Sequence, residues 1–356
     1  MPVSKGNSAP GITVMAPGGI DQAGLSILAS RWAEALRVNG YGCELLLGRA
    51  KRHPDEGPAA EFDEMPQAIH AWCDYASDAD RLLVVGLPPG LEEAHSAIAA
   101  LAGAGSRATL LWERPHTPIL GLAELLGVTP LAEIRIATLN PRFVSPLRAQ
   151  LGGNPVAALP LALPQVAFEG GAQRRCQDPF AIAIGRFTAR KGAARLSREW
   201  AEHVGPRLKL KLLMLGSGYG GGDSEEDRVL ELAHSSPWVE CDQIGPLQDR
   251  LDCIRTASCA VFAAVDDHLP QALVEALAVE VPVVATPIAA HLEVVEHEVT
   301  GFVLGGTDLD DLGEVIEKSV LGDPAGSLQV ARAGSARVRQ LCEPLAAGRA
   351  ILAYLL

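Results

Sequence analysis

The sequence predicts an α/β protein built from two Rossmann-like domains. Short apolar runs, typical of buried parallel strands, alternate with segments of helical spacing along the chain. The alternation restarts near residue 180, after a stretch with the composition of a loop. At 356 residues, the chain is also longer than one hydrophobic core usually supports.

The composition is that of an ordinary globular protein, with 48% hydrophobic and 21% charged residues. A net charge of −13 disfavours nucleic acid and anionic membranes as partners. Seven scattered cysteines without a C-x-x-C pair predict reduced thiols and no zinc or disulfide framework. Without a membrane-length apolar run or a signal-peptide core, we expect a cytoplasmic protein.

In the first half, strand 12–16 runs into a turn that contains Gly18 and Gly19. These glycines either let a ligand approach the backbone or only shape the turn. His116 follows strand 109–112 and is a candidate site residue, although a lone histidine beside prolines is more often structural. The other expected elements are strands 43–47, 82–86, 134–138 and 156–163 and helices 25–38, 66–75, 91–102, 120–126 and 141–151.

The domain boundaries follow from the loop-like stretch. We expect an N-terminal domain over 1–163, a linker over 164–179 and a C-terminal domain over 180–335. Residues 336–356 are expected to be helical with an apolar end.

The second half opens with strand 180–184, followed by the basic turn GRFTARKG and a helix over 193–203. Arg186 and Lys191 would there lie beside the free backbone N–H groups of a helix N-terminus. Cationic side chains at such a terminus predict an anion site, the alternative being a solvated basic turn.

The next strand, 208–215, ends in a glycine run that includes Gly216 and Gly218 and satisfies G-x-G-x-x-G. This pattern alone suggests a dinucleotide site. Because the run continues into polar residues instead of opening an apolar helix, NAD is the weaker interpretation. A helix is expected over 247–256.

The most informative stretch is residues 259–304. An apolar strand over 260–265 delivers Asp266 and Asp267 at its carboxyl end, and a helix over 271–279 carries Glu275. Asp267 and Glu275 are eight positions apart and could present two carboxylates to one ligand. A strand at 281–285 and helices at 308–320 and 328–356 complete the chain.

The segments DHLPQALVEALA, PVVATP and LEVVEHEVTGFVL together resemble the donor-binding region of retaining glycosyltransferases of family 4. That family has the GT-B architecture, in which two facing Rossmann-like domains enclose the active cleft. The resemblance implies transfer of a sugar from a nucleotide diphosphate sugar, here a UDP-sugar by expectation, to a hydroxyl acceptor with retained configuration. It also implies that the C-terminal helix crosses back to the first domain.

The resemblance also assigns roles to residues. Arg186 and Lys191 would hold the diphosphate, Glu275 the ribose, and Asp267 the donor sugar. His116 would lie near the sugar or acceptor. Further donor contacts would come from Gly18, Gly19, Gly216, Gly218, Gly245, Leu269, Pro270 and Gln271. Neither a metal nor a cofactor is expected, because the cationic side chains can stabilise the leaving diphosphate.

Several departures from the family pattern leave alternatives open. Asp267 stands in place of glutamate, Ala289-Ala290 in place of a glycine pair, and Glu280 in place of a glycine. A catalytically silent GT-B partner or scaffold is one alternative, and a sugar-nucleotide epimerase or hydrolase is another. No basic amphipathic helix is evident, which favours a soluble acceptor such as a small molecule or natural product over a membrane lipid.

Overall fold

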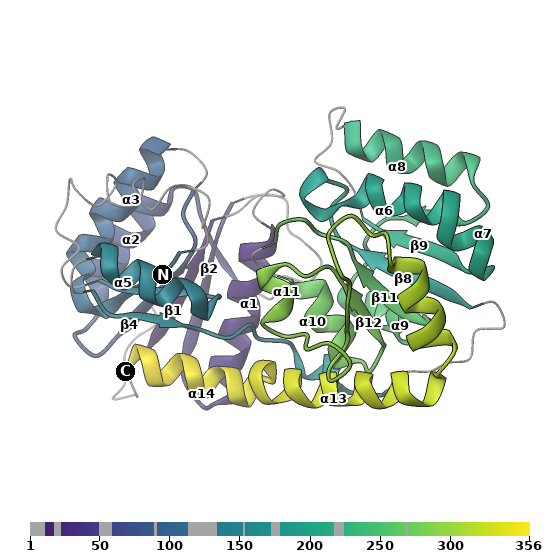
Figure 1. Cartoon of the computed structure of the whole chain (residues 1–356). Coiled ribbons are helices and arrows are strands. Elements are labelled where there is room, and N and C mark those ends of the chain that lie inside the picture. The colour runs from purple at the N-terminus through teal and green to yellow at the C-terminus, as the bar shows by residue number, and fades with distance from the viewer. Residues whose placement is uncertain are drawn as a thin grey trace. The chain divides into compact units, whose positions relative to one another are not determined.

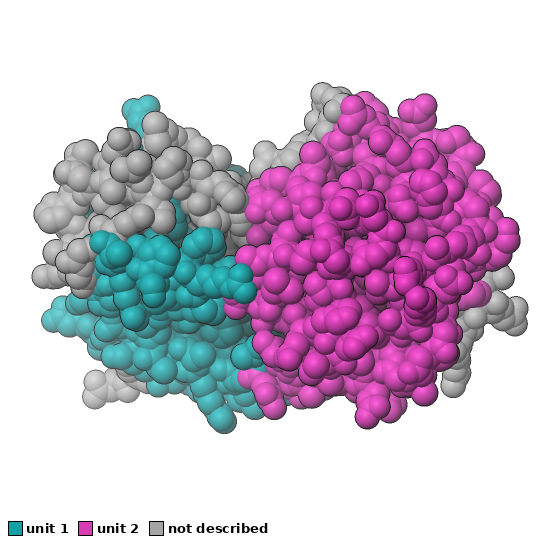
Figure 2. Space-filling model, viewed as in Figure 1, with its two compact units in different colours: residues 1–164, 341–356 teal, residues 165–340 magenta. Residues whose placement is uncertain are grey.

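The computed structural model describes residues 11–17, 23–49, 59–88, 91–112, 134–151, 154–171, 179–216, 224–267 and 270–356. The chain divides into two compact units: unit 1 comprises 1–164 and 341–356, and unit 2 comprises 165–340 (Figure 2). Each unit contains one parallel sheet with helices between its strands, so the predicted α/β class is confirmed. Within the described residues, no helix combines the length and apolarity needed to cross a membrane.

The sheet of unit 1 has the strand order β3-β2-β1-β4-β5-β6-β7, and every pair is parallel. Its strands are β1 (Ile12–Ala16), β2 (Cys43–Gly48), β3 (Ala60–Phe62), β4 (Arg81–Val85), β5 (Ala108–Leu111), β6 (Arg135–Thr138) and β7 (Val156–Ala158). The predicted strand 156–163 is therefore shorter than expected, and β3 falls in a segment where none was predicted.

The helices of unit 1 pack on both faces of this sheet. They are α1 (Ala23–Val38), α2 (Met65–Tyr75), α3 (Leu91–Ala104), α5 (Val144–Leu151) and α14 (Pro344–Leu355) (Figure 1). Trp72 of α2, Ile98 of α3 and Leu147 of α5 share one core with the strands. On α14, a Cβ added at Gly348 would lie 2.5 Å from the Ala35 carbonyl of α1, so glycine permits this close helix contact.

The sheet of unit 2 has the order β10-β9-β8-β11-β12-β13, again entirely parallel. Counted within the unit, this is 3-2-1-4-5-6, the order of a doubly wound nucleotide-binding sheet. The strands are β8 (Phe180–Ile184), β9 (Lys211–Leu215), β10 (Val239–Asp242), β11 (Cys259–Phe262), β12 (Val283–Ala285) and β13 (Phe302–Val303).

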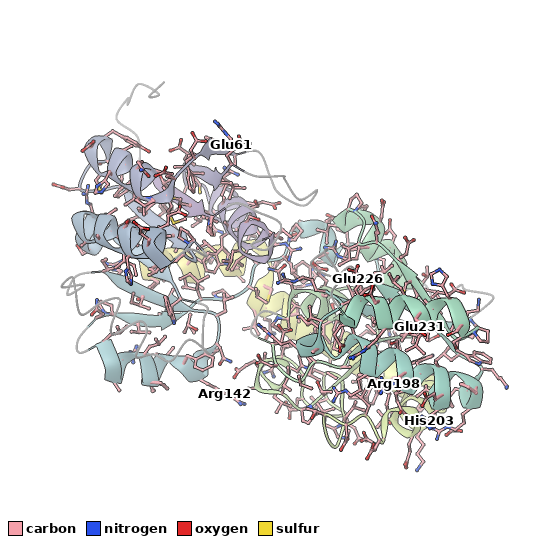
Figure 3. The ribbon with its side chains drawn as sticks, turned by 90° about the horizontal axis from the view of Figure 1, so that it is seen from above. Glu61, Arg142, Arg198, His203, Glu226 and Glu231 are labelled. Atoms are coloured by element: carbon pink, nitrogen blue, oxygen red, sulfur yellow. The ribbon has the colours of Figure 1, made fainter. Side chains whose placement is uncertain are left out.

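The helices of unit 2 include three that the sequence analysis did not predict. They are α6 (Ala193–Glu199), α7 (Gly205–Leu208), α8 (Ser224–Ser235), α9 (Leu247–Thr256), α10 (Gln271–Ala278), α11 (Ala289–Leu292), α12 (Leu312–Val315) and α13 (Pro324–Cys342), with π-helical turns at Trp200–Val204 and Ile316–Leu321. The unpredicted helices are α7, α11 and the longer α8. Its charged side chains, such as Glu226 and Glu231, and those of Arg198 and His203 on the helix after β8 lie at the outer surface (Figure 3).

Candidate functional site

The reversal of strand order in unit 2 lies between β8 and β11. In open parallel sheets, ligands bind beyond the carboxyl ends of the two strands at such a switch point. Arg186 and Lys191 follow β8, and Asp266 and Asp267 follow β11. The fold thus brings predicted site residues from two separate turns to one edge of the sheet.

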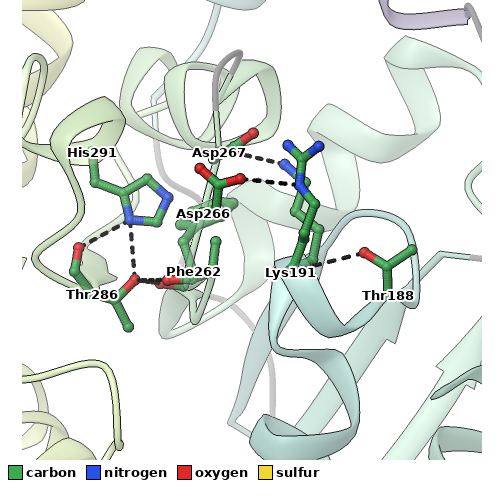
Figure 4. Close-up of polar contacts among 9 residues, drawn as sticks. Thr188, Lys191, Phe262, Asp266, Asp267, Thr286 and His291 are labelled. Atoms are coloured by element: carbon green, nitrogen blue, oxygen red, sulfur yellow. Dashed lines mark hydrogen bonds and ion pairs between the residues drawn. The ribbon is translucent and has the colours of Figure 1, made fainter. Parts of the chain in front are cut away.

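Two ion pairs join these turns. Lys191 Nζ donates to Asp267 Oδ2 at 2.6 Å, and Arg190 Nε lies 3.4 Å from Asp266 Oδ2 (Figure 4). The Lys191 side chain keeps 30% of its surface exposed while that of Asp267 keeps only 7%. Because an ammonium group carries three protons, Lys191 can hold Asp267 and still donate to an anion.

The turn after β8 has a fixed backbone. Thr188 caps a short 3₁₀ helix, Ala189–Lys191, by accepting a hydrogen bond from Lys191 N at 3.4 Å. Gly192 then adopts φ 68°, and a Cβ there would lie 2.2 Å from the Ala263 carbonyl. Glycine is therefore required by both conformation and space, and it brings the start of α6 against the end of β11.

Strand β11 ends earlier than the sequence predicted. Its ladder stops at Phe262, and Val265 is 43% exposed in a bend whose amide donates to the Arg190 carbonyl at 2.9 Å. The hydroxyl of Thr286 donates to the Ala264 carbonyl at 2.5 Å and so satisfies a backbone group that has left the sheet. The predicted strand 260–265 is thus wrong in its last residues, and Asp267 stands on a turn.

Glu275, the predicted ribose ligand, is engaged by another side chain. It lies on α10 with 2% of its surface exposed, and Arg250 on α9 donates to both of its oxygens, at 3.0 and 3.2 Å. Arg250 also donates to the Gly245 carbonyl at 3.1 Å. This bidentate pair, which the sequence analysis missed, links the loop at Gly245, a predicted donor contact, to the predicted ribose ligand.

The other predicted donor contacts are placed as follows. Gly216 packs tightly, since a Cβ there would lie 2.0 Å from the Gly185 carbonyl, which explains that glycine by packing. Pro270 is buried and precedes α10, whose first residue is Gln271. Gly18, Gly19, His116, Gly218 and Leu269 lie outside the described residues.

A buried histidine also lies beside the Lys191–Asp267 pair. His291 on α11 is 1% exposed, and its Nδ1 lies 3.0 Å from the Thr286 carbonyl oxygen. Burial lowers the pKa of His291 to about 4; the charge of Asp267 opposes this shift and that of Lys191 adds to it. The apolar context of His291 in the sequence gave no sign of this position.

The described parts of the chain offer few groups for metal binding or for thiol chemistry. No cluster of three or more histidine, cysteine, aspartate or glutamate side chains there could hold a metal ion. Burial raises the pKa of Cys43 and Cys342 to about 12 and that of Cys241 to about 11, so these thiols stay protonated at neutral pH.

Comparison with known families places this site in context. Residues 171–333, which include both turns and Glu275, match the model of the family "Glycosyl transferases group 1". This segment is therefore similar to group 1 glycosyltransferases. It extends over nearly all of unit 2.

A curated relative is similar in sequence. The capsular polysaccharide biosynthesis glycosyltransferase CapM of Staphylococcus aureus is 27% identical over 144 residues, which are 40% of this chain. The match spans 37% of the length of CapM.

Solved structures resemble the whole chain and identify its fold. Sucrose-phosphate synthase of Thermosynechococcus elongatus aligns with a TM-score of 0.70 and 16% identity, covering 97% of this chain and 98% of that one. HepE of Anabaena, solved with UDP and glucose, aligns with a TM-score of 0.71, 16% identity and the same coverages. A glycosyltransferase of Rickettsia africae gives 0.72, 14% identity and 98% of both chains. The chain therefore has the GT-B fold.

Proposed function

We propose that this protein transfers a sugar from a nucleotide diphosphate sugar to a hydroxyl of a soluble acceptor, with retention of configuration. The observation that carries the proposal is the charged cluster of Lys191, Asp267, Arg190 and Asp266 at the switch point of a domain similar to group 1 glycosyltransferases. A UDP-sugar is the proposed donor, supported by the UDP and glucose bound in the structurally similar HepE.

The proposed chemistry is departure of the diphosphate while positive charge develops on the sugar. Fixed cations beside the departing phosphate lower this barrier most, because negative charge grows there. Lys191 retains free donor capacity for this role, and exposed Arg186 follows the same strand. The N-terminus of α6 adds backbone donors. In this proposal, no metal ion is required.

Asp267 would face the donor sugar in this arrangement. A carboxylate paired with Lys191 can accept hydrogen bonds from sugar hydroxyls. We propose no covalent intermediate; the acceptor hydroxyl attacks on the face from which the diphosphate leaves, and a phosphate oxygen takes its proton. The acceptor would be a small molecule, such as a natural product.

Calorimetric titration in EDTA with a panel of nucleoside diphosphates and their sugars tests the donor assignment. Arg186→Ala is expected to weaken nucleotide binding roughly ten- to hundredfold, the value of one charge-assisted hydrogen bond. Arg198→Ala is the matched control, because this arginine is exposed at the outer surface on α6 (Figure 3). Equal losses in both variants, or no binding across the panel, would contradict the proposal.

A catalytically silent partner is the second candidate. It is favoured by the engagement of Glu275 by Arg250 and by Ala289 and Ala290 at the start of α11. Nucleotide binding without sugar release or transfer, over a broad acceptor screen, would support it. Sugar release in the absence of an acceptor would instead indicate a hydrolase, and interconversion of donor sugars an epimerase.

A further inference from the structure

The protonation of His291 follows from its hydrogen bonds. Nδ1 lies 3.0 Å from the Thr286 carbonyl oxygen and 3.3 Å from the Thr286 hydroxyl. A carbonyl oxygen only accepts, so Nδ1 carries the proton. The hydroxyl donates its own proton to Ala264 O and accepts from the same Nδ1–H. In the neutral ring, Nε2 is therefore an acceptor.

This acceptor faces the charged cluster. The ring edge that carries Nε2 points toward Asp267 and Lys191 (Figure 4), and both of those charges act on the imidazole. Among the residues that the structure describes, all hydrogen bonds of the His291 side chain are made by Nδ1. The side chain is 1% exposed, and within the described part of the chain its Nε2 acceptor has no protein partner. A ligand group that donates a hydrogen bond would satisfy this acceptor.

Because Nε2 is a hydrogen-bond acceptor, only some groups of a sugar nucleotide can bind to it. The phosphate oxygens of a nucleoside diphosphate are acceptors at neutral pH and would be repelled by the lone pair of Nε2. A sugar hydroxyl donates, and Asp267 is the neighbouring group proposed to bind the sugar. One ammonium proton of Lys191 is donated to Asp267 at 2.6 Å, and the proposed function assigns the others to the phosphate oxygens. A sugar hydroxyl is therefore the best match.

We infer that His291 is a specificity-determining residue for the donor sugar, whose hydroxyl donates a hydrogen bond to Nε2. This inference rests on the proposed function. The proposed contact comes from the His291 side chain on α11, which lies on the opposite side of Asp267 from Thr188 (Figure 4). The Nδ1 contact with Thr286 fixes the ring, so that Nε2 accepts a hydrogen bond from the hydroxyl at one position of the sugar.

The variant His291→Asn tests the roles of the two ring nitrogens separately. An asparagine amide can keep the donor to the Thr286 carbonyl, while nothing replaces Nε2. His291→Gln is the reciprocal variant, because its longer side chain can present an acceptor near the Nε2 position. Both variants are compared with the full wild-type chain in calorimetric titrations with UDP and UDP-glucose, or with the matched nucleotide pair that binds best in the panel above.

His291→Asn is expected to weaken UDP-glucose binding roughly three- to tenfold and to leave UDP binding unchanged, while His291→Gln restores part of the difference. One deoxy analogue of UDP-glucose should bind weakly to wild type and lose nothing more in His291→Asn. Equal changes for UDP and UDP-glucose, or none, would overturn the inference alone. Absence of any nucleotide binding by wild type would overturn the proposed function and this inference with it.

Discussion

A guanidinium group on α9 binds both oxygens of the carboxylate that the sequence assigned to the ribose. Arg250 and Glu275 are 6% and 2% exposed, so each charge is removed from water and depends on the other. A substitution of Glu275 would therefore disturb folding as well as ligand binding. A loss of donor affinity in Glu275→Gln alone could not identify a ribose contact.

Arg250→Met is expected to destabilise the protein by about 3–5 kcal/mol, because it removes the guanidinium that donates to both oxygens of a buried carboxylate. The double variant Arg250→Met/Glu275→Leu is expected to lose much less than the sum of the single variants. Scanning calorimetry of the four proteins measures this coupling. Additive losses would mean that the pair is not a unit, and the Glu275 carboxylate could then be tested by substitution alone.

The sequence identified those site residues whose local turn chemistry is visible. Lys191 and Asp267 follow short apolar strands, so their position at a sheet edge could be predicted before the pairing was known. Arg250 could not be found in this way, since an arginine within a polar helix usually faces water and only its tertiary partner turns it inward. His291 lacked a signal as well, because its apolar sequence context does not show that the ring lies beside the Lys191–Asp267 pair.

At the scale of the elements, the end of α10 is strained. Glu280 adopts φ 62°, the left-handed conformation that glycine normally takes after a helix. Its amide donates to the Leu277 carbonyl at 3.1 Å, which closes the helix. The glycine expected here from the family pattern is thus missing in sequence, while the backbone geometry that favours it remains.

Glu280→Gly is expected to stabilise the protein by about 1 kcal/mol, since glycine avoids the steric cost of this conformation. The lost pairing with Arg332, at 3.6 Å and exposed, is expected to offset little. Thermal unfolding measures the gain, and Glu280→Ala is the control because it removes the same charge without relieving the backbone. A melting temperature of Glu280→Gly no higher than that of Glu280→Ala would contradict this account.

Most elements could be predicted because their apolar residues recur with a clear period. The missed ones lack that signal: β3 is three residues long and largely exposed, and among the described side chains of α8 only Val229 is buried. The helix after β8 continues through a π-helical turn to Leu208, so β9 starts at Lys211, later than predicted. Apolar periodicity alone does not place such a boundary.

At the scale of the whole molecule, the proposed function predicts which residues change their amide hydrogen exchange when a nucleotide binds. UDP is expected to slow amide hydrogen exchange at residues 185–192 and 263–267 of unit 2, because it would order both turns. Strands β4 and β5, in the core of unit 1, are the internal reference and should not change. Exchange measured on the full chain by mass spectrometry tests this, and unchanged exchange in both turns at saturating UDP would count against the site.

The division of the chain between units also has a consequence for biosynthesis. Helix α14 belongs to unit 1, where the Tyr354 hydroxyl donates to the Ile136 and Pro155 carbonyls and Arg81 Nε donates to Leu355 O. These contacts cannot form until residues 344–355 have left the ribosome, after all of unit 2 has been made. Unit 1, most of which is translated before unit 2, is therefore completed after it. Until α14 has been made, α1 lacks its packing contact with that helix.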